Sequence, residues 1–493
     1  MKLVLALVWT LSSTVFSQNI THDTDYDLAK VVEYDQIKGS CDKYFKLLNK
    51  DGRLKKENQG TEDAARLEVL CGKWIFFYLE AKSNIGIPEA LLRSLKFYFK
   101  EDIGESYSKW GFYPDPVDKG QALGVIKTKP HNKRFKDLMV PAQRQISCAG
   151  CHVGKLPDGR YSVGMPNEIL DISLFNKYMV FPLWLVSKEK ENEEKFHPEL
   201  IALYKNLREK MKSAPRHFPN TLDMSVISGK LMPSSWMYNM IQQYPPSLGD
   251  QVSYVNGRPG VFNAASPLIS FGDRDFYTSI PPIWGLTHEK GNEKLAYLGT
   301  ITSAPYLEAF IKHAFVYTTY TDDYSVDKYV TPLAAYLRTL KAPKFGGTLK
   351  RDLVNTGKLT FEAKCQSCHD GPHGESSFRV DIKDVGTPWQ LSGIFNDYVD
   401  PNFQSKRLLD GLQSAFPFET ITEGIKSRRL NGIWARKLLM TNGSIDGLDH
   451  LFCLNGKSRN ETKREALTQY VHEDLCHLSE NEKLSLKEYL LTF

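Results

Sequence analysis

Two short motifs of the same form carry the most distinctive chemistry in this 493-residue sequence. Each has two cysteines separated by two residues and followed directly by a histidine: Cys148, Cys151 and His152 in the first, and Cys365, Cys368 and His369 in the second. Two thiols at this spacing reach both vinyl groups of a haem, and the adjacent imidazole lies beneath the iron as its proximal ligand. The sequence therefore predicts two covalently bound c-type haems.

Zinc knuckles and thioredoxin-like redox sites also use cysteine pairs at this spacing. A structural zinc site needs four Cys or His ligands gathered together. A redox Cys-x-x-Cys does not require a histidine at the next position in both copies. The repeated histidine therefore favours haem over both alternatives.

The N-terminus has the form of a secretory signal peptide. Met1 and Lys2 precede an apolar stretch over 3–9, and Val15 and Ser17 suit the −3 and −1 positions of a cleavage site. Such a segment is removed on export, so we assign residues 1–17 to it. No later apolar run reaches the roughly 18 residues that span a bilayer. We therefore expect an exported bacterial protein, periplasmic or secreted, without an integral membrane segment.

Export affects what the other four cysteines do. Cys41 and Cys71 flank one N-terminal stretch, and Cys453 and Cys476 flank one C-terminal stretch. In an oxidising compartment each pair is expected to form a disulfide across a loop of modest length. Other pairings of these four cysteines remain open from the sequence.

Composition places the chain among ordinary globular proteins. Hydrophobic residues make up 41% and charged residues 25%, and the net charge is only +5. Lys and Arg are scattered among acidic residues rather than gathered into a stripe, which argues against a nucleic-acid partner.

The elements that must position the motifs are mainly helices. Apolar residues recur at steps of three and four over 62–82, 87–100, 199–212 and 326–339. The stretches between them are rich in Pro, Gly, Asn and Tyr, most clearly over 245–282. Such stretches favour long irregular connections packed over a buried cofactor. The predicted fold class is therefore mainly α.

The C-terminal third resembles a class I cytochrome c domain. A helix expected over 349–363 carries Gly357 and Phe361 on one face and delivers the second motif. Ser479 and Glu482 predict a capping box that opens a final helix. Its candidate buried residues are Leu484, Leu486, Tyr489 and Leu490. We expect Tyr489 to lie against the gap left by Gly357, and we assign 345–493 to this haem domain.

The remaining mature chain, 18–344, would form an N-terminal haem domain enlarged by long irregular insertions. The two motifs would then lie in two cytochrome c-like domains of unequal size.

The C-terminal half is also similar to the dihaem cytochromes grouped with the bacterial rubber oxygenases, which are distant relatives of dihaem cytochrome c peroxidases. Three segments carry the resemblance: Gly-Ile-Trp-Ala at 432–435, Thr-Asn-Gly-Ser-Ile at 441–445, and the stretch from His472 to Leu490. The resemblance implies that His472 is the sixth ligand of the second haem. At Thr441 the family usually has a histidine, so a role of that histidine in coupling the haems does not carry over.

Several other residues remain candidates for the sixth ligand of the second haem. His477, Met440 and His450 are the alternatives to His472. His373 lies only four residues beyond His369 and is poorly placed to reach the opposite face of the haem.

Two further segments match the family loosely. They are 256–263 and the Pro-Pro-Ile-Trp sequence at 281–284. In the family the corresponding Trp lies against the first haem. The resemblance therefore implies that Trp284 is near the catalytic iron or on the path between the haems, although a buried aromatic without a special role fits the residues nearly as well.

The family usually leaves the distal side of the first haem free. The residues alone leave other ligands open, because Met and His side chains follow the first motif at several separations. They are Met165, Met211, Met224, Met232, His217, His288 and His313, whereas Met237 and Met240 suit a helix core.

Three functions follow from these alternatives. In the first, the haem on His152 binds O₂ or peroxide and the bis-His haem relays electrons between an unknown substrate and a redox partner. In the second, the protein reduces hydrogen peroxide, which needs an acid–base group such as Glu168, Asp171 or His217. In the third, both irons are six-coordinate and the protein only carries electrons.

Overall fold

The structure is a computed structural model, and the parts of the chain that it describes surround both motifs. They are residues 34–79, 87–88, 108, 110–115, 121–127, 131–132, 139–140, 143–171, 260–263, 277–286, 295–297, 302–304, 307–308, 311, 327–369, 379–381, 419–420, 424–426, 428–440, 443, 445–457 and 472–493. The predicted signal peptide, 1–17, and the expected helix over 199–212 lie outside these residues.

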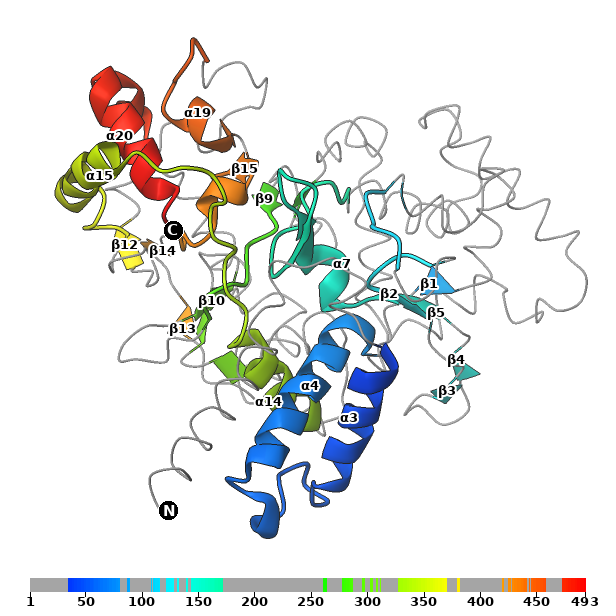
Figure 1. The fold of residues 1–493 in the computed structure, drawn as a ribbon. Coiled ribbons are helices and arrows are strands. Elements are labelled where there is room, and N and C mark those ends of the chain that lie inside the picture. Colours follow the sequence, from blue (N-terminus) through cyan, green and yellow to red (C-terminus); the bar gives the residue numbers. More distant parts are fainter. Residues whose placement is uncertain are drawn as a thin grey trace, which may run out of the picture.

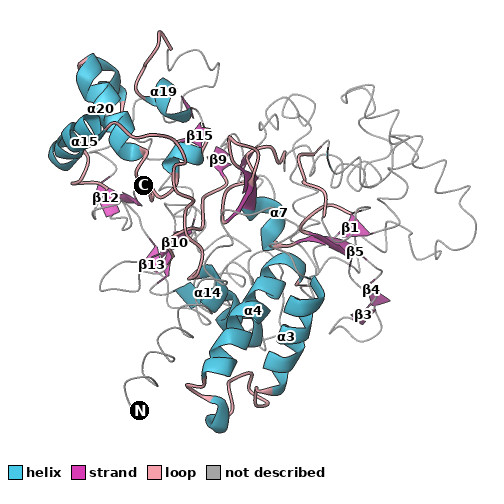
Figure 2. Cartoon of the chain, viewed as in Figure 1, coloured by secondary structure: helices cyan, strands magenta, loops and turns pink. Residues whose placement is uncertain are grey.

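Helices are the longest elements of the described chain (Figure 2). They are α3 (Tyr34–Lys46), α4 (Glu62–Tyr78), α7 (Cys148–His152), α14 (Asp327–Leu337), α15 (Arg351–Lys364), α19 (Gly447–Leu451) and α20 (Glu480–Leu490). Single 3₁₀ segments cover Lys56–Asn58, Ile433–Ala435 and Glu473–His477.

Short antiparallel strands join the helices, and none of those described exceeds four residues. One three-stranded sheet has the order β1 (Ile87–Pro88), β5 (Gln143–Ile146), β2 (Val125–Lys127), and another has β10 (Leu295–Tyr297), β11 (Thr302–Ala304), β13 (Glu419–Thr420). Five two-stranded ribbons pair β3 (His131–Asn132) with β4 (Met139–Val140), β6 (Val153–Lys155) with β7 (Tyr161–Val163), β8 (Val261–Asn263) with β9 (Tyr277–Ser279), β12 (Arg379–Asp381) with β14 (Gly424–Lys426), and β15 (Leu438–Leu439) with β16 (Ile445–Asp446).

The start of the helix expected over 87–100 is wrong. Ile87 and Pro88 form a strand that pairs with Arg144 and Gln143. A residue before proline is pushed toward extended backbone, and proline cannot donate a hydrogen bond, so this dipeptide suits a sheet edge better than a helix interior.

The expected contact between the two C-terminal helices is confirmed. A Cβ on Gly357 of α15 would collide with the carbonyl oxygen of Ser485 and would lie 2.8 Å from the Cβ of Tyr489, both on α20. The ring of Tyr489 lies 5.4 Å from that of Phe361. Only glycine allows the two helices to approach this closely.

The capping box of α20 is also present, with Ser479 and Glu482 in reciprocal hydrogen bonds. Leu486, Tyr489 and Leu490 are buried as expected. Leu484 is exposed, contrary to expectation. The face that meets α15 contains Ser485 and Tyr489, which are four residues apart, and Leu484 lies off that face.

The same contact occurs a second time, in the N-terminal part. A Cβ on Gly72 of α4 would collide with the carbonyl oxygen of Pro332 and would lie 2.7 Å from the Cβ of Tyr336, both on α14. The ring of Tyr336 lies 5.6 Å from that of Phe76. Each pair thus uses a glycine, an aromatic four residues later, and a tyrosine from the crossing helix.

Two apolar clusters accompany the two helix pairs. One packs α3, α4 and α14 around the first motif, and the other packs α15 and α20 with the segments near 430–454. The pairs lie apart, with α15 and α20 at the upper left of the view and α4 and α14 at the lower centre (Figure 1). Ala435, from the predicted C-terminal domain, belongs to the first cluster, so the two clusters meet near this residue.

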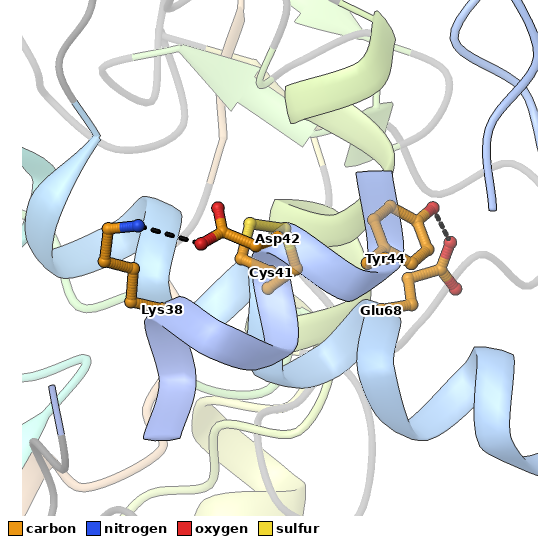
Figure 3. The surroundings of a disulfide bond; sticks show 6 residues. Lys38, Cys41, Asp42, Tyr44 and Glu68 are labelled. Carbon is orange, nitrogen blue, oxygen red and sulfur yellow. Dashed lines mark hydrogen bonds and ion pairs between the residues drawn. A yellow bond between two sulfur atoms is a disulfide. The ribbon is translucent and has the colours of Figure 1, made fainter. Parts of the chain in front are cut away.

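Disulfides join Cys41 to Cys71 and Cys453 to Cys476, the pairing that the sequence favoured. The first ties α3 to α4 beside a hydrogen bond of 2.7 Å from Tyr44 to Glu68 (Figure 3). Burial and that contact raise the pKa of Tyr44 well above its ordinary value. The four motif cysteines are free.

Candidate functional site

The first motif forms α7, which lies at the C-terminal end of α4 (Figure 1). The Ser147 hydroxyl donates a hydrogen bond of 2.9 Å to the carbonyl of Phe77, the next-to-last residue of α4. Gly124, with a φ of +76°, lies against the main chain of Gly150, where a Cβ would collide with the Gly150 amide. Two glycines therefore let the motif lie directly on the turn before β2.

The chain after the motif returns to hold its carbonyl groups. The amide of Gly164 donates to the carbonyl of His152 at 2.8 Å, and the amide of Asn167 donates to that of Cys151 at 2.8 Å. The buried side chain of Asn167 donates to the carbonyls of Gly150 and Gly111. These bonds satisfy carbonyls that the end of a short helix leaves without partners. Asn167 was not predicted, since nothing but its closeness to the motif distinguishes it.

Burial keeps the first histidine neutral. It lowers the pKa of His152 to about 4, an effect that the nearby carbonyl of Pro281 partly opposes. Among the described residues, the buried Nδ1 of His152 has no hydrogen-bond partner. A ligating histidine is neutral and ordinarily directs its second ring N–H to a backbone carbonyl, so Pro281 is the residue expected to receive it.

Burial disfavours the ionised form of three motif thiols, Cys148, Cys151 and Cys365. Burial raises the pKa of Cys148 to about 11 and that of Cys151 to about 12. In the second motif it raises the pKa of Cys365 to about 11. In a c-type haem, two thiols at this spacing form thioether bonds with the vinyl groups and the adjacent imidazole ligates the iron.

The second motif begins where α15 ends. The amides of Cys368 and His369 donate to the carbonyl of Cys365, at 3.1 and 2.9 Å, which folds the motif into a tight turn. Burial, together with the nearby His472, lowers the pKa of His369 to about 4. The carbonyl of Arg428 opposes this effect, as that of Pro281 does at His152. The two motif histidines therefore have matching surroundings.

The ring of His472 lies opposite that of His369. Their centres are 6.0 Å apart and their planes differ by 33°. With metal–imidazole bonds of about 2 Å, and about 1 Å from each nitrogen to its ring centre, an iron between two imidazoles separates the centres by about 6 Å. The distance fits a bis-His iron, and the sequence resemblance had implied this residue.

The alternatives to His472 are placed differently. His450 directs its Nδ1 to the carbonyl of Asp446 at 2.7 Å, and His477 is exposed. The main chain of Met440 accepts a hydrogen bond from Ser279. His373 lies outside the described residues.

His472 is in an unusual backbone conformation. Its φ is +62°, in the left-handed region that non-glycine residues rarely adopt. It directly precedes the 3₁₀ segment Glu473–His477, which the disulfide from Cys453 holds at Cys476. The disulfide thus anchors the segment that presents His472.

Trp284 is buried between the segment after the first motif, at Gly164, and the segment at Gly432. Its indole Nε1–H donates to the carbonyl of Val163 at 2.7 Å. A Cβ on Gly164 would lie 2.5 Å from the indole, and a Cβ on Gly432 would collide with its opposite edge. The amide of Gly164 donates a hydrogen bond to the carbonyl of His152, and the amide of Gly432 donates one to the carbonyl of Phe493, which belongs to the second cluster. Trp284 therefore contacts segments next to both motifs.

Among the residues suggested for the first site, three lie in the described part. Met165 is buried against Gly154, two residues beyond His152. Both carboxylate oxygens of Glu168 accept main-chain hydrogen bonds, from Lys437 and Leu438, and the amide of Asp171 donates to Trp110. The other candidates lie outside the described residues: Met211, Met224, Met232, Met237, Met240, His217, His288 and His313.

No known protein-family profile matches this chain, and no curated protein matches it. Within the described residues, none of the helices is both long and apolar enough to cross a membrane. The same residues contain no group of three or more His, Cys, Asp or Glu side chains that could hold a metal ion by themselves.

Proposed function

We propose that the protein is an exported dihaem c-type cytochrome oxidoreductase, with one covalent haem on each Cys-x-x-Cys-His motif. A bound haem supplies one-electron chemistry and, where a position on its iron is open, chemistry with O₂ or peroxide. The 6.0 Å separation of the His369 and His472 rings carries this proposal, since it matches the spacing of two imidazoles that ligate one six-coordinate iron.

The cysteines support the same assignment. The four outside the motifs form the two disulfides, while the four within them are free thiols. A redox-active Cys-x-x-Cys, the main rival for these pairs, would use the thiols to form a disulfide and leave the paired histidines without a role.

The repeated helix contact supports two related haem domains. Gly72, Phe76 and Tyr336 repeat the arrangement of Gly357, Phe361 and Tyr489, and each motif lies at the end of the glycine-bearing helix. In the second domain Cys365 follows Gly357 by eight residues, whereas in the first Cys148 follows Gly72 by 76. The N-terminal domain is thus the enlarged one in this proposal.

The two haems divide the work. His369 and His472 would both ligate the iron of the second haem, which would leave that haem only the relay of electrons. The first haem, with His152 beneath it, is the site that binds O₂ or peroxide. Trp284 contacts the segments that hold both motifs and lies on the path between them. Pro281, three residues before it, orients His152.

The contacts weigh against specific forms of the rival functions. A sixth ligand must lie on the haem face opposite His152, whereas Met165 packs beside Gly154 on the chain that leaves His152. Glu168 already uses its carboxylate to bind the main chain of 437–438, which leaves it badly placed to assist O–O cleavage.

Optical and EPR spectra of the purified protein test the proposal. We expect one low-spin haem whose spectrum does not change when cyanide or carbon monoxide is added. The spectrum of the other haem should shift because it binds these ligands. Two low-spin haems that bind neither ligand in either redox state would mean a pure electron carrier. A protein without covalent haem would overturn the assignment.

A further inference from the structure

One buried arginine, Arg436, makes no ion pair with an acidic side chain among the described residues. The side chain of Arg436 is buried, with 5% of the residue exposed. Its Nη2 donates one long hydrogen bond, 3.4 Å, to the carbonyl of Leu438, and its Nε has no partner. A guanidinium has five N–H donors and does not give up its proton in proteins. Its buried Nε–H is therefore an unused donor in a side chain that is almost entirely removed from water.

The neighbouring charges do not compensate it. Glu168 is the acidic group whose charge acts on Arg436, but its oxygens accept hydrogen bonds from the amides of Lys437 and Leu438, and the described residues show no ion pair between the two side chains. Arg428 lies near enough for its own positive charge to oppose that of Arg436. Arg428 therefore adds to the positive charge around Arg436 and does not compensate it. A buried charge without a partner strongly destabilises a fold.

The cluster adjoins the second motif. The carbonyl of Arg428 acts on His369, and its Nη1 donates to the Ser279 hydroxyl at 2.7 Å. That hydroxyl donates in turn to the carbonyl of Met440 at 3.2 Å. Arg436 thus lies near Arg428, whose main chain adjoins the histidine to which the proposed function assigns a haem.

We propose that Arg436 binds a carboxylate, and that this carboxylate is a propionate of the haem held by His369 and His472. The inference rests on the proposed function. A planar guanidinium binds a carboxylate through two parallel hydrogen bonds, and each haem carries two carboxylates that need such partners when they are buried. The propionate provides the missing negative charge, and Arg428 and Ser279 line the same site.

The variants R436Q and R436K test this, with R66Q as control, because Arg66 forms an exposed ion pair with Asp63. Each is purified with its covalent haem, extensively dialysed to remove small carboxylates, and studied by resonance Raman spectroscopy in the propionate bending region and by spectroelectrochemistry. Thioether bonds hold the haem, so both haems stay bound. In R436Q we expect a shifted propionate mode of the low-spin haem and about a tenfold loss in the equilibrium constant for its reduction. R436K keeps the charge, so it shifts the mode but leaves that constant close to the wild-type value. R66Q changes neither.

A double variant, E168Q/R436Q, separates this role from a simple balance with Glu168. If Arg436 only offset the carboxylate of Glu168, removing both charges would restore the wild-type Raman mode, and the proposal would be wrong. If Arg436 holds the propionate, the mode stays shifted. An unchanged mode in R436Q or R436K, or a change confined to the first haem, also overturns it. Wild-type protein that lacks covalent haem would instead refute the proposed function.

Discussion

At the scale of single residues, both motif histidines lie in surroundings that suppress their charge. Burial lowers the pKa of each to about 4, and each has a backbone carbonyl beside it, from Pro281 or from Arg428. Iron binds only the neutral imidazole, so the protein holds both rings in the form that ligates at neutral pH. In the proposed function, what lies opposite each ring decides between electron relay and reaction with O₂ or peroxide.

Replacing His472 should open the second iron. In H472G we expect the low-spin signal of that haem to disappear and cyanide to bind it, while two haems per chain remain attached through their thioether bonds. EPR and optical titration measure this. H477G is the matched control, since His477 belongs to the same short segment but is exposed. If the EPR and optical spectra of H472G were identical to those of the wild type, His472 would not be the sixth ligand of the second haem.

The sequence predicted more at this scale than at any other. The cysteines and proximal histidines follow from spacing alone, and His472 followed from the resemblance. Arg436 and Asn167 could not be predicted, because their roles depend on burial and on partners distant in the chain. The guanidinium of Arg436 has no special sequence context, and only the fold removes it from water.

At the scale of elements, two glycines set the closest helix contacts. A methyl group on Gly72 or Gly357 would collide with the carbonyl of the crossing helix. We expect G72A and G357A each to lower the free energy of unfolding by about 1–3 kcal/mol, or more if the helices cannot separate. Thermal or denaturant unfolding measures it.

G39A provides the control for these glycine variants. Gly39 lies within α3, and a Cβ added to it would have no neighbouring atom within 4 Å, so alanine there should be neutral or stabilising by about 0.4–1 kcal/mol. Equal losses in all three variants would mean that the helix contacts contribute nothing specific.

The disulfide Cys453–Cys476 should matter for ligation as well as for stability. Removing either disulfide is expected to cost about 2–4 kcal/mol by freeing the unfolded chain. Only the double variant C453A/C476A should also increase high-spin signal at the second haem, because Cys476 anchors the segment that presents His472. C41A/C71A is the matched control. Identical spectra in the two variants would contradict this role.

Helix prediction from the apolar pattern failed at Ile87 and Pro88, which form a strand, but it succeeded elsewhere in the described chain, even where Pro332 lies inside the helix. The helices expected over 326–339 and 349–363 are present as α14 and α15. The N-terminal helix contact was not foreseen, because 76 residues separate Gly72 from Cys148 and hide its likeness to the C-terminal contact. The return of that inserted chain to the end of α4 is a tertiary event that local patterns do not encode.

At the scale of the whole molecule, Trp284 connects the two parts. It fills the space between Gly164 and Gly432, which belong to segments 268 residues apart in sequence. Its hydrogen bond to Val163 fixes the indole. The position suits electron transfer between the surroundings of the two motifs better than a role confined to one of them.

Replacing this indole should slow electron transfer between the haems. In W284F we expect both haems to remain and the equilibration between them, followed by stopped-flow or flash photolysis, to slow several-fold. W434F is the control, since Trp434 also donates its Nε1–H to a carbonyl, that of Pro343, but is only partly buried. Equal rates in W284F and wild type would mean that electrons do not use this residue.

The most direct test of the account is the intact mass of the denatured wild-type protein, produced in a bacterium that attaches c-type haem. The account predicts a chain that begins after Ser17 and carries the added mass of two haems, with its two disulfides formed. A chain of unmodified mass, with all four motif thiols free or joined as disulfides, would contradict the central claim that each motif binds a haem.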